Sequence, residues 1–556
     1  MSGESDAKRQ IGKIARSRSV SAFTILVLLS IAAFLTRLMP ISISRYPFNN
    51  DSLTSCGIAS DILSSGHLQL LPPSVYGETH AGSTPAFGLL ISFFSGCLGS
   101  APLETAQLLV AVLAVLTIGG VFVLARMILG DLLGATTAGL TAILLGTFVF
   151  TTGSAWPEAL GVSLFVLILI SFVRRSAIEF RVLCFLGLML IPLVHHLVAA
   201  VALITLAYVV LWSWYFAIWN RSLRKRNLLD MVTIAVPALW AVFYYSSVSL
   251  DRLSVFSSTM EVALLVSSFC LLGLVSVIVL SMKTHSKLTF APVVGIAALI
   301  LLVLSYYGYL FSYTPSSPER AYLLFAAFTS IIVAFSWFGA ELIIEHRPVY
   351  RAIAVGLLLP PLTIMGYGLV RSSAALSQQI IYRTFDFLDI FIFLGVGAAI
   401  VGLRARHVTR YAALSITVVI CLVLSFPYGY ASEQLLGVRH DTQAYEVDTL
   451  GWLNDHGGAN HLMSDERLSH VALSMFGFSK DASLPDHFKR GDQISSSWIC
   501  LAEASWTTAG VNNYPMGLLV IPESNFTAAL DASDVFYVGG PIGDQTILFT
   551  GSDLEL

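Results

Sequence analysis

The chain has 556 residues, of which 56% are hydrophobic and only 12% are charged. Globular proteins carry about 25% charged residues, so this composition excludes a water-soluble enzyme. The formal net charge of -3 gives no indication of nucleic-acid binding, and the six cysteines show no CxxC or Cys/His metal spacing. The charged residues separate apolar runs of about 17 to 25 residues, which is typical of a helical protein with many membrane spans.

The N-terminal 18 residues are polar and basic, and an apolar run from residue 19 to residue 36 follows them. This run is longer than a typical signal-peptide core and has no small-residue cleavage site. We therefore expect residues 1–18 to form a cytoplasmic basic tail. Residues 19–36 are expected to form a first span that is retained in the mature protein.

The apolar pattern predicts about thirteen transmembrane helices within residues 19–427. After the first, they are expected at 103–125, 132–154, 159–173, 182–194, 197–219, 228–248, 259–281, 289–311, 321–344, 352–370, 387–403 and 411–427. Residues 86–98 are too few to cross about 30 Å at 1.5 Å per residue, so they are expected to form a helix on the outer surface. Residues 182–219 are too many for one span, so we expect a turn at His195-His196.

The distribution of lysine and arginine orients these spans. Up to residue 440, twenty basic residues fall on the side of the N-terminus and seven fall on the other side. Because cytoplasmic loops are enriched in basic residues, the N-terminus is expected in the cytoplasm of a plasma-membrane protein. The loop at residues 37–102 and the C-terminal region would then lie outside.

The apolar runs stop near Asp441, and from there to the end the chain has sixteen acidic and four basic residues. Helices are predicted at 442–454 and 465–476, and strands at 462–464, 518–521, 535–538 and 545–549. We expect residues 428–556 to form a small extracytoplasmic soluble α/β domain. It shows no catalytic constellation and would suit a lid or an acceptor-binding module.

Ionisable residues gather at the predicted outer ends of the spans: Asp51, Glu158, the pair His195 and His196, Arg320, and Arg383 with Asp386 and Asp389. Each has an ordinary structural explanation. Asp51 could cap the predicted helix 52–63, Glu158 could complement a helix dipole, and Arg383 could form a local salt bridge. Charges at one depth of a bundle are nevertheless costly unless they pair or line a cavity, so the set predicts a functional site.

The arrangement resembles the GT-C superfamily of polyprenyl-phosphate-dependent glycosyltransferases, which includes protein O-mannosyltransferases, aminoarabinose transferases and oligosaccharyltransferase catalytic subunits. Asp51, in the string PFNND, holds the place of the acidic residue that follows the first span in this group. Glu158 matches a second acidic position between the third and fourth spans. The segment from His80 to Pro85 resembles the histidine-proline start of the surface helix, and thirteen spans before an exported domain resemble the oligosaccharyltransferase layout.

The chain also departs from the oligosaccharyltransferase pattern. Its second outer loop has no DxD or ExD, and its C-terminal region has no WWDxG, the nearest string being WLNDHG at residues 452–457. The string SSPE at residues 316–319 resembles the SxxE-like element only loosely. These departures favour a GT-C enzyme of another type over an oligosaccharyltransferase.

The resemblance implies that a sugar is moved from a polyprenyl-phosphate donor, such as a dolichol-type lipid, to an extracytoplasmic protein, lipid or glycan acceptor with inversion. Asp51 would act as the base, and Glu158 would orient the acceptor or hold a cation. The donor phosphate would be bound by arginines, whose planar fork suits phosphate, namely Arg383, Arg320 and Arg371. Histidines would support sugar or phosphate by hydrogen bonds: His80, His195 and His196.

Three questions stay open at the level of sequence. A divalent cation is possible, but only the carboxylates of Asp51, Asp61, Glu78 and Glu158 are available outside, so no metal is assigned. Cys56 and Cys97 share the exported loop and could be a disulfide or two free thiols. A transporter or flippase of lipid-linked saccharides, or a non-catalytic membrane scaffold, remains an alternative function.

Overall fold

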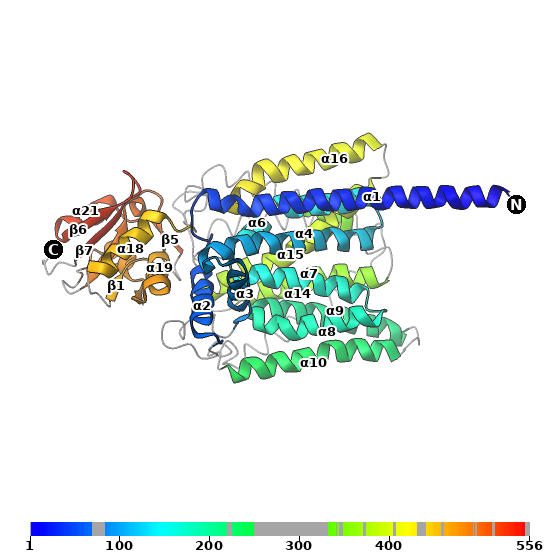
Figure 1. The fold of residues 1–556 in the computed structure, drawn as a ribbon, viewed down its shortest axis with the longest axis horizontal. Coiled ribbons are helices and arrows are strands. Elements are labelled where there is room, and N and C mark those ends of the chain that lie inside the picture. Colours follow the sequence, from blue (N-terminus) through cyan, green and yellow to red (C-terminus); the bar gives the residue numbers. More distant parts are fainter. Residues whose placement is uncertain are drawn as a thin grey trace.

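The computed structural model describes residues 2–49, 51–68, 84–219, 225–248, 332–340, 342–343, 348–370, 374–403, 407–430, 441–456, 461–492, 494, 498–513 and 517–550. Within them, a helical bundle lies beside a smaller C-terminal segment, residues 441–550, that contains all the strands (Figure 1). Five of the described helices are long and apolar enough to cross a membrane, or six if one bent pair forms a single span. The predicted spans 259–281 and 289–311, and most of 321–344, lie outside the described residues.

The bundle is built from long helices that end at the expected local signals. Its described members are α1 (Ser2–Leu38), α4 (Pro102–Leu129), α5 (Leu132–Leu144), α6 (Gly146–Gly153), α7 (Pro157–Val173), α8 (Ile178–Val194), α9 (His196–Trp219), α10 (Lys225–Ser247), α14 (Pro348–Val370), α15 (Ala374–Gly402) and α16 (His407–Ile420), which continues through η4 (Cys421–Ser425) and η5 (Phe426–Tyr430). Proline opens α4 and α7, where a missing N–H costs nothing. The predicted turn at His195-His196 is confirmed, because His195 is extended between α8 and α9.

The structure adds two details to the predicted helices of the bundle. Helix α1 begins at Ser2, so the residues assigned to a basic tail continue the helix of the first span. The predicted span 132–154 is not one straight helix, because α5 and α6 meet at Leu145 with a bend of 67°, as in a broken span or a re-entrant loop. Gly146 allows the close packing that follows the bend, since a Cβ there would lie 2.1 Å from the carbonyl oxygen of Ser425.

The side chain of Arg37, at the end of α1, is fully buried at this bend. Its Nη1 donates to the carbonyl oxygen of Ile143 at 2.7 Å, and its Nη2 donates to that of Ala142 at 3.1 Å. Its Nε donates to Oγ1 of Thr152 at 3.1 Å. The last carbonyls of a helix have no intrahelical partner and carry partial negative charge, so Arg37 completes the C-terminus of α5 and ties it to α6.

The first outer loop folds onto one end of the bundle, which we call the α2 end. It contains η1 (Met39–Ser42), α2 (Asp51–Ser65) and α3 (Ala86–Leu98), so the predicted helices 52–63 and 86–98 are confirmed. Helix α2 lies across the ends of the long helices, on the side of the C-terminal segment (Figure 1). Cys56 is buried and Cys97 is exposed, and both are free thiols.

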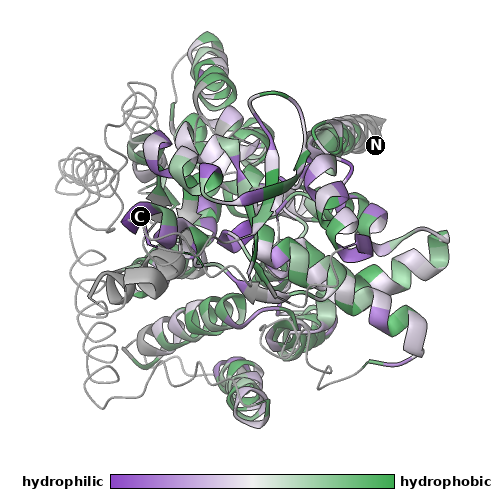
Figure 2. Ribbon diagram, turned by 90° about the vertical axis from the view of Figure 1, so that its left-hand side faces the viewer, coloured by the Kyte–Doolittle hydropathy of each residue, from purple (hydrophilic) through white to green (hydrophobic). Residues whose placement is uncertain are grey.

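The C-terminal segment is a mixed α/β unit. Its elements are α18 (Ala444–His456), β1 (His461–Met463), α19 (Glu466–Phe476), β2 (Ser479–Asp481), α20 (Leu484–Arg490), β3 (Ile499–Glu503), η6 (Ala504–Thr507), β4 (Val511–Asn513), β5 (Gly517–Leu519), α21 (Glu523–Asp531), β6 (Asp534–Gly539) and β7 (Thr546–Thr550). Five strands form one sheet in the order β2-β1-β3-β7-β6, in which β1 pairs in parallel with β2 and β3. Figure 2 views the molecule from the side of the C-terminal segment. Hydrophobic residues dominate many of the helices at the periphery of this view.

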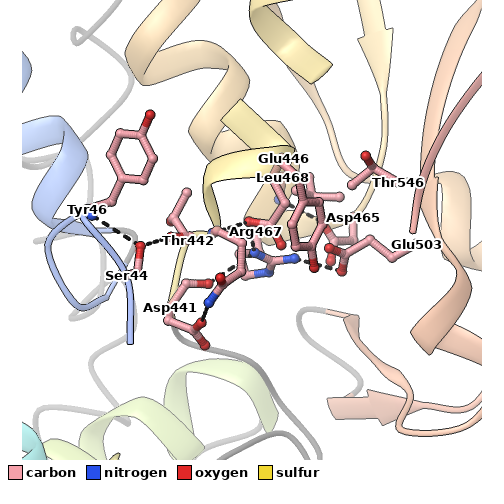
Figure 3. Close-up of polar contacts among 12 residues, drawn as sticks. Ser44, Tyr46, Asp441, Thr442, Glu446, Asp465, Arg467, Leu468, Glu503 and Thr546 are labelled. Carbon is pink, nitrogen blue, oxygen red and sulfur yellow. Dashed lines mark hydrogen bonds and ion pairs between the residues drawn. The ribbon is translucent and has the colours of Figure 1, made fainter. Parts of the chain in front are cut away.

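A buried ionic cluster lies inside the C-terminal segment (Figure 3). Arg467 on α19 donates to Oε2 of Glu446 at 2.8 Å and to Oε2 of Glu503 at 2.7 Å. Asp465 caps the same helix by accepting from the N–H of Leu468 at 2.6 Å. Three buried carboxyl groups thus surround one guanidinium, and burial raises the pKa of Glu446 to about 8 and that of Asp465 to about 7.

We expect Arg37→Met to destabilise the bundle by at least about 2 kcal/mol, because buried carbonyls of α5 lose their donors. Thermal unfolding in detergent measures the change. Arg45→Met is the matched control, since Arg45 is 62% exposed and its contacts, an ion pair with Asp448 at 3.2 Å and the ring of Tyr46 at 5.0 Å, lie at the surface. A midpoint for Arg37→Met equal to that of the control would contradict the structural role of Arg37.

The ionic cluster predicts a pH-dependent stability. A folded-state pKa of Glu446 raised above 4.5 to about 8 means that the folded chain keeps a proton that the unfolded chain releases. Stability is therefore full at low pH and falls as the pH rises through about 8. We expect unfolding of the C-terminal segment to need on the order of 1 kcal/mol less at pH 9 than at pH 6.

Denaturant unfolding monitored by tryptophan fluorescence at the two pH values measures this difference. Glu446→Gln should reduce the pH dependence of stability. Glu523→Gln, at an exposed position, is the matched control and should leave it unchanged. Equal pH dependence in the wild type and Glu446→Gln would show that Glu446 does not carry the proton.

Candidate functional site

The first candidate residue, Asp51, begins α2 directly after a tight turn. Asn49 has φ of 81°, a left-handed conformation that asparagine tolerates better than most residues. Its Oδ1 accepts a hydrogen bond from the N–H of Asp51 at 3.1 Å, and its carbonyl oxygen accepts from Ser52 Oγ. Asn49 thus satisfies a backbone donor at the helix start, and the side chain of Asp51 is 49% exposed.

Arg383 joins Asp51 to the second acidic candidate. Its Nη1 lies 2.7 Å from Oε1 of Glu158, and its Nη2 lies 3.6 Å from Oδ2 of Asp51. The guanidinium is also 5.5 Å from the ring centroid of Trp156, within the range of a cation–π contact. Three elements far apart in sequence, α2, α7 and α15, therefore converge at the α2 end. The two carboxylates differ in exposure, because the side chain of Glu158 is only 6% exposed.

The histidine pair extends this cluster. Nε2 of His195 lies 3.1 Å from Oε1 of Glu158, and the ring of His195 stacks on that of His196 with centroids 4.5 Å apart. The Nδ1 atom of His195 is buried and has no hydrogen-bond partner among the described residues. Because Oε1 of Glu158 faces both His195 and Arg383, Glu158 is fixed from two sides.

The two aspartates of α15 lie deeper in the bundle and face α6. Thr151 Oγ1 donates to Asp386 Oδ1 at 2.6 Å, and Thr147 Oγ1 donates to Asp389 Oδ2 at 2.7 Å. Both aspartates are buried. The local explanation of Arg383 as a salt bridge within α15 is therefore too narrow, since its ion pairs reach α2 and α7.

Sequence reasoning did not single out Gln107, a glutamine in the apolar run of α4. Its Nε2 donates to the carbonyl oxygens of Arg37 and Gly153, each at 2.9 Å, and its Oε1 accepts from the N–H of Phe48 at 3.0 Å. It thereby connects the end of α1, the end of α6 and the turn before Asp51. The one available signal was an amide inside a predicted span, where an unsatisfied polar group is costly.

Other candidates lie outside the described residues, namely His80, Arg320 and Arg371. Within the described part of the chain, no group of three or more His, Cys, Asp and Glu side chains could hold a metal ion. The positive charge between Asp51 and Glu158 is supplied by Arg383. Chemically, the site combines a half-exposed carboxylate, which can accept a proton, with a guanidinium, which can bind an anion.

Comparison with known proteins finds likeness only in three dimensions. No protein-family model and no curated protein matches the chain. The oligosaccharyltransferase AglB from the archaeon Archaeoglobus fulgidus, solved with an inhibitory peptide and a dolichol-phosphate, has 13% identity and a TM-score of 0.52, covering 97% of this chain and 75% of AglB. An Archaeoglobus fulgidus oligosaccharyltransferase with Zn and sulfate has 12% identity and a TM-score of 0.50, covering 95% and 73%.

A third solved structure, the arabinofuranosyltransferase AftD from Mycobacteria, has 13% identity and a TM-score of 0.47, and the alignment covers 95% of this chain but 40% of AftD. The first two alignments include both the bundle and the C-terminal segment, because they extend over nearly the whole chain. Oligosaccharyltransferases are among the GT-C enzymes that the sequence resembles. The chain thus shares the fold of these oligosaccharyltransferases over nearly its whole length, in agreement with the resemblance seen in the sequence.

Proposed function

We propose that this protein is a membrane glycosyltransferase that moves a sugar from a polyprenyl-phosphate donor to an extracytoplasmic acceptor with inversion. The observation that carries the proposal is the convergence of Asp51, Glu158 and Arg383 at the α2 end of a GT-C fold. The dolichol-phosphate and the inhibitory peptide in the AglB complex support a lipid phosphate and a macromolecular acceptor as ligand classes. Under this proposal, the α2 end faces the outside of a plasma membrane and the N-terminus faces the cytoplasm.

In the proposed reaction, an acceptor hydroxyl or amide attacks the anomeric carbon from the face opposite the phosphate. The new bond forms to the acceptor atom, the bond from carbon to phosphate oxygen breaks, and the phosphate leaves with the electron pair. Asp51 takes the acceptor proton, for which its half-exposed carboxylate is suited. A positioned base of this kind typically contributes 10² to 10⁴-fold to the rate.

Arg383 is proposed to bind the leaving phosphate. Its guanidinium lies beside the base and is held by the buried Glu158, which His195 contacts in turn. Holding an arginine in place reduces the entropy that phosphate binding would otherwise cost. We therefore assign to Glu158 the role of orienting Arg383, in addition to the role in acceptor orientation that the sequence suggests. Arg320 and Arg371 remain further phosphate candidates, and His80 and His196 remain supporting donors.

We expect Asp51→Asn to lower the rate of transfer by about 10² to 10⁴-fold, because asparagine cannot accept the proton. The assay follows radiolabelled polyprenyl-phosphate sugars from the host in proteoliposomes that contain host acceptors. Asp61→Asn, on the same helix, is the matched control and should retain activity. Consumption of donor by Asp51→Asn at the wild-type rate would show that Asp51 is not the base. Movement of the lipid-linked sugar across the bilayer without its consumption would identify a flippase.

Arg383→Lys should lower kcat/KM by about 10 to 100-fold, because lysine keeps the charge but lacks the fork that spans Glu158 and a phosphate. The same assay at varied donor concentration measures it. The control is Arg410→Lys, because Arg410 forms its ion pair with Asp131 at 3.0 Å away from this site. If the kcat/KM of Arg383→Lys equals that of Arg410→Lys, the guanidinium of Arg383 has no specific role in donor binding.

A further inference from the structure

The C-terminal segment shares its hydrophobic core with the first outer loop. Tyr46 and Leu53 belong to the same buried cluster as residues of α18, α19 and the five-stranded sheet. Leu53 is 2% exposed and so lies fully inside this cluster. Burying a leucine side chain contributes about 1.5 to 3 kcal/mol, so this contact is not incidental.

Polar contacts fix the same interface. Thr54 Oγ1 on α2 lies 2.7 Å from Nε2 of His470 and 3.4 Å from Oγ of Ser474, both on α19. Between the first outer loop and the C-terminal segment, Ser44 Oγ also donates to the carbonyl oxygen of Thr442, and it accepts from the N–H of Tyr46 (Figure 3). Hydrogen bonds are directional, so these contacts define the orientation of α2 against α19 as well as its distance.

The opposite side of α2 packs on the bundle. Cys56 and Ala59 are buried in a cluster with Phe48, Phe87 and residues of α4. Helix α2 is therefore held between the bundle and the C-terminal segment, as its place in Figure 1 also indicates. Asp51 lies three residues before Thr54, on the turn of the helix that α19 contacts.

Helix α19 is itself rigidly placed within the C-terminal segment. Arg467, three residues before His470, pairs with Glu446 of α18 and Glu503 of β3, and its side chain is only 5% exposed. Removing one partner of such a buried ion pair is strongly unfavourable, so α19 cannot shift without moving the elements around it. A displacement of the C-terminal segment is thereby transmitted through α19 to α2.

We propose that the C-terminal segment sets the position of Asp51 through the contact between α19 and α2, with His470 as the positioning residue. The effect on catalysis rests on the proposed function, whereas the contact between α19 and α2 does not. It gives the C-terminal segment a defined part in the reaction. An acceptor that binds the C-terminal segment would act on the base through the same contact.

The first test measures hydrogen exchange of the α2 amides in the full chain in nanodiscs. His470→Leu should speed exchange in residues 51–65 by about tenfold or more, and His470→Gln, which can still hydrogen-bond Thr54, should restore most of the protection. Exchange in β3 and β7 reports whether the C-terminal segment stays folded. His456→Leu, at an exposed position on α18, is the matched control.

Thr54→Val removes the same hydrogen bond from the α2 side with little change of shape, so it serves if His470→Leu unfolds the C-terminal segment. Unchanged α2 exchange in Thr54→Val, or in a folded His470→Leu, overturns the inference. In the transfer assay, both variants should lower kcat by about tenfold with the donor KM unchanged, and His470→Gln should recover activity. Faster α2 exchange in these variants, combined with full transfer activity of Asp51→Asn, would support the positioning of α2 by α19. It would reject only the proposed role of Asp51 as the base.

Discussion

The buried guanidinium of Arg37 is the interaction on which the arrangement of the α2 end depends. It binds the last carbonyls of α5 and the hydroxyl of Thr152, and none of these acceptors is a carboxylate. The partial negative charge of a helix C-terminus therefore stabilises the buried guanidinium in an apolar bundle. Because α6 is fixed there, its threonines reach Asp386 and Asp389 of α15. Trp156 and Glu158 come shortly after the end of α6, and both contact the guanidinium of Arg383.

Local signals in the sequence were sufficient for much of the fold. The helix at residues 86–98, the turn within residues 182–219 and the β-rich runs at 535–538 and 545–549 were predicted from neighbouring residues alone. The structure agrees with each of these predictions. The bend at Leu145 could not be predicted in this way, because the run 132–154 contains no charged residue and no proline. What allows the bend is a carbonyl-binding arginine more than 100 positions earlier in the chain.

The same distinction applies to the site. Asp51, Glu158, His195 and Arg383 could be grouped because charged residues in a membrane protein are scarce and these share one predicted depth. Their pairing could not be deduced, because it depends on how α7 and α15 pack. Gln107 could not be recognised from the sequence, because a single amide in an apolar run forms no motif with its neighbours. In the structure it accepts a hydrogen bond from the N–H of Phe48, in the turn before Asp51.

The shared core of the first outer loop and the C-terminal segment affects how the protein is made. Ser44 and Thr442, which meet at this interface, are 398 positions apart, so the loop emerges from the ribosome long before its partner exists. Contacts this distant in sequence form late in folding. Until the last part of the chain has been made, the loop that carries Asp51 therefore lacks the C-terminal residues that share a buried cluster with Leu53. An incompletely synthesised chain can thus insert its helices and still lack an ordered site.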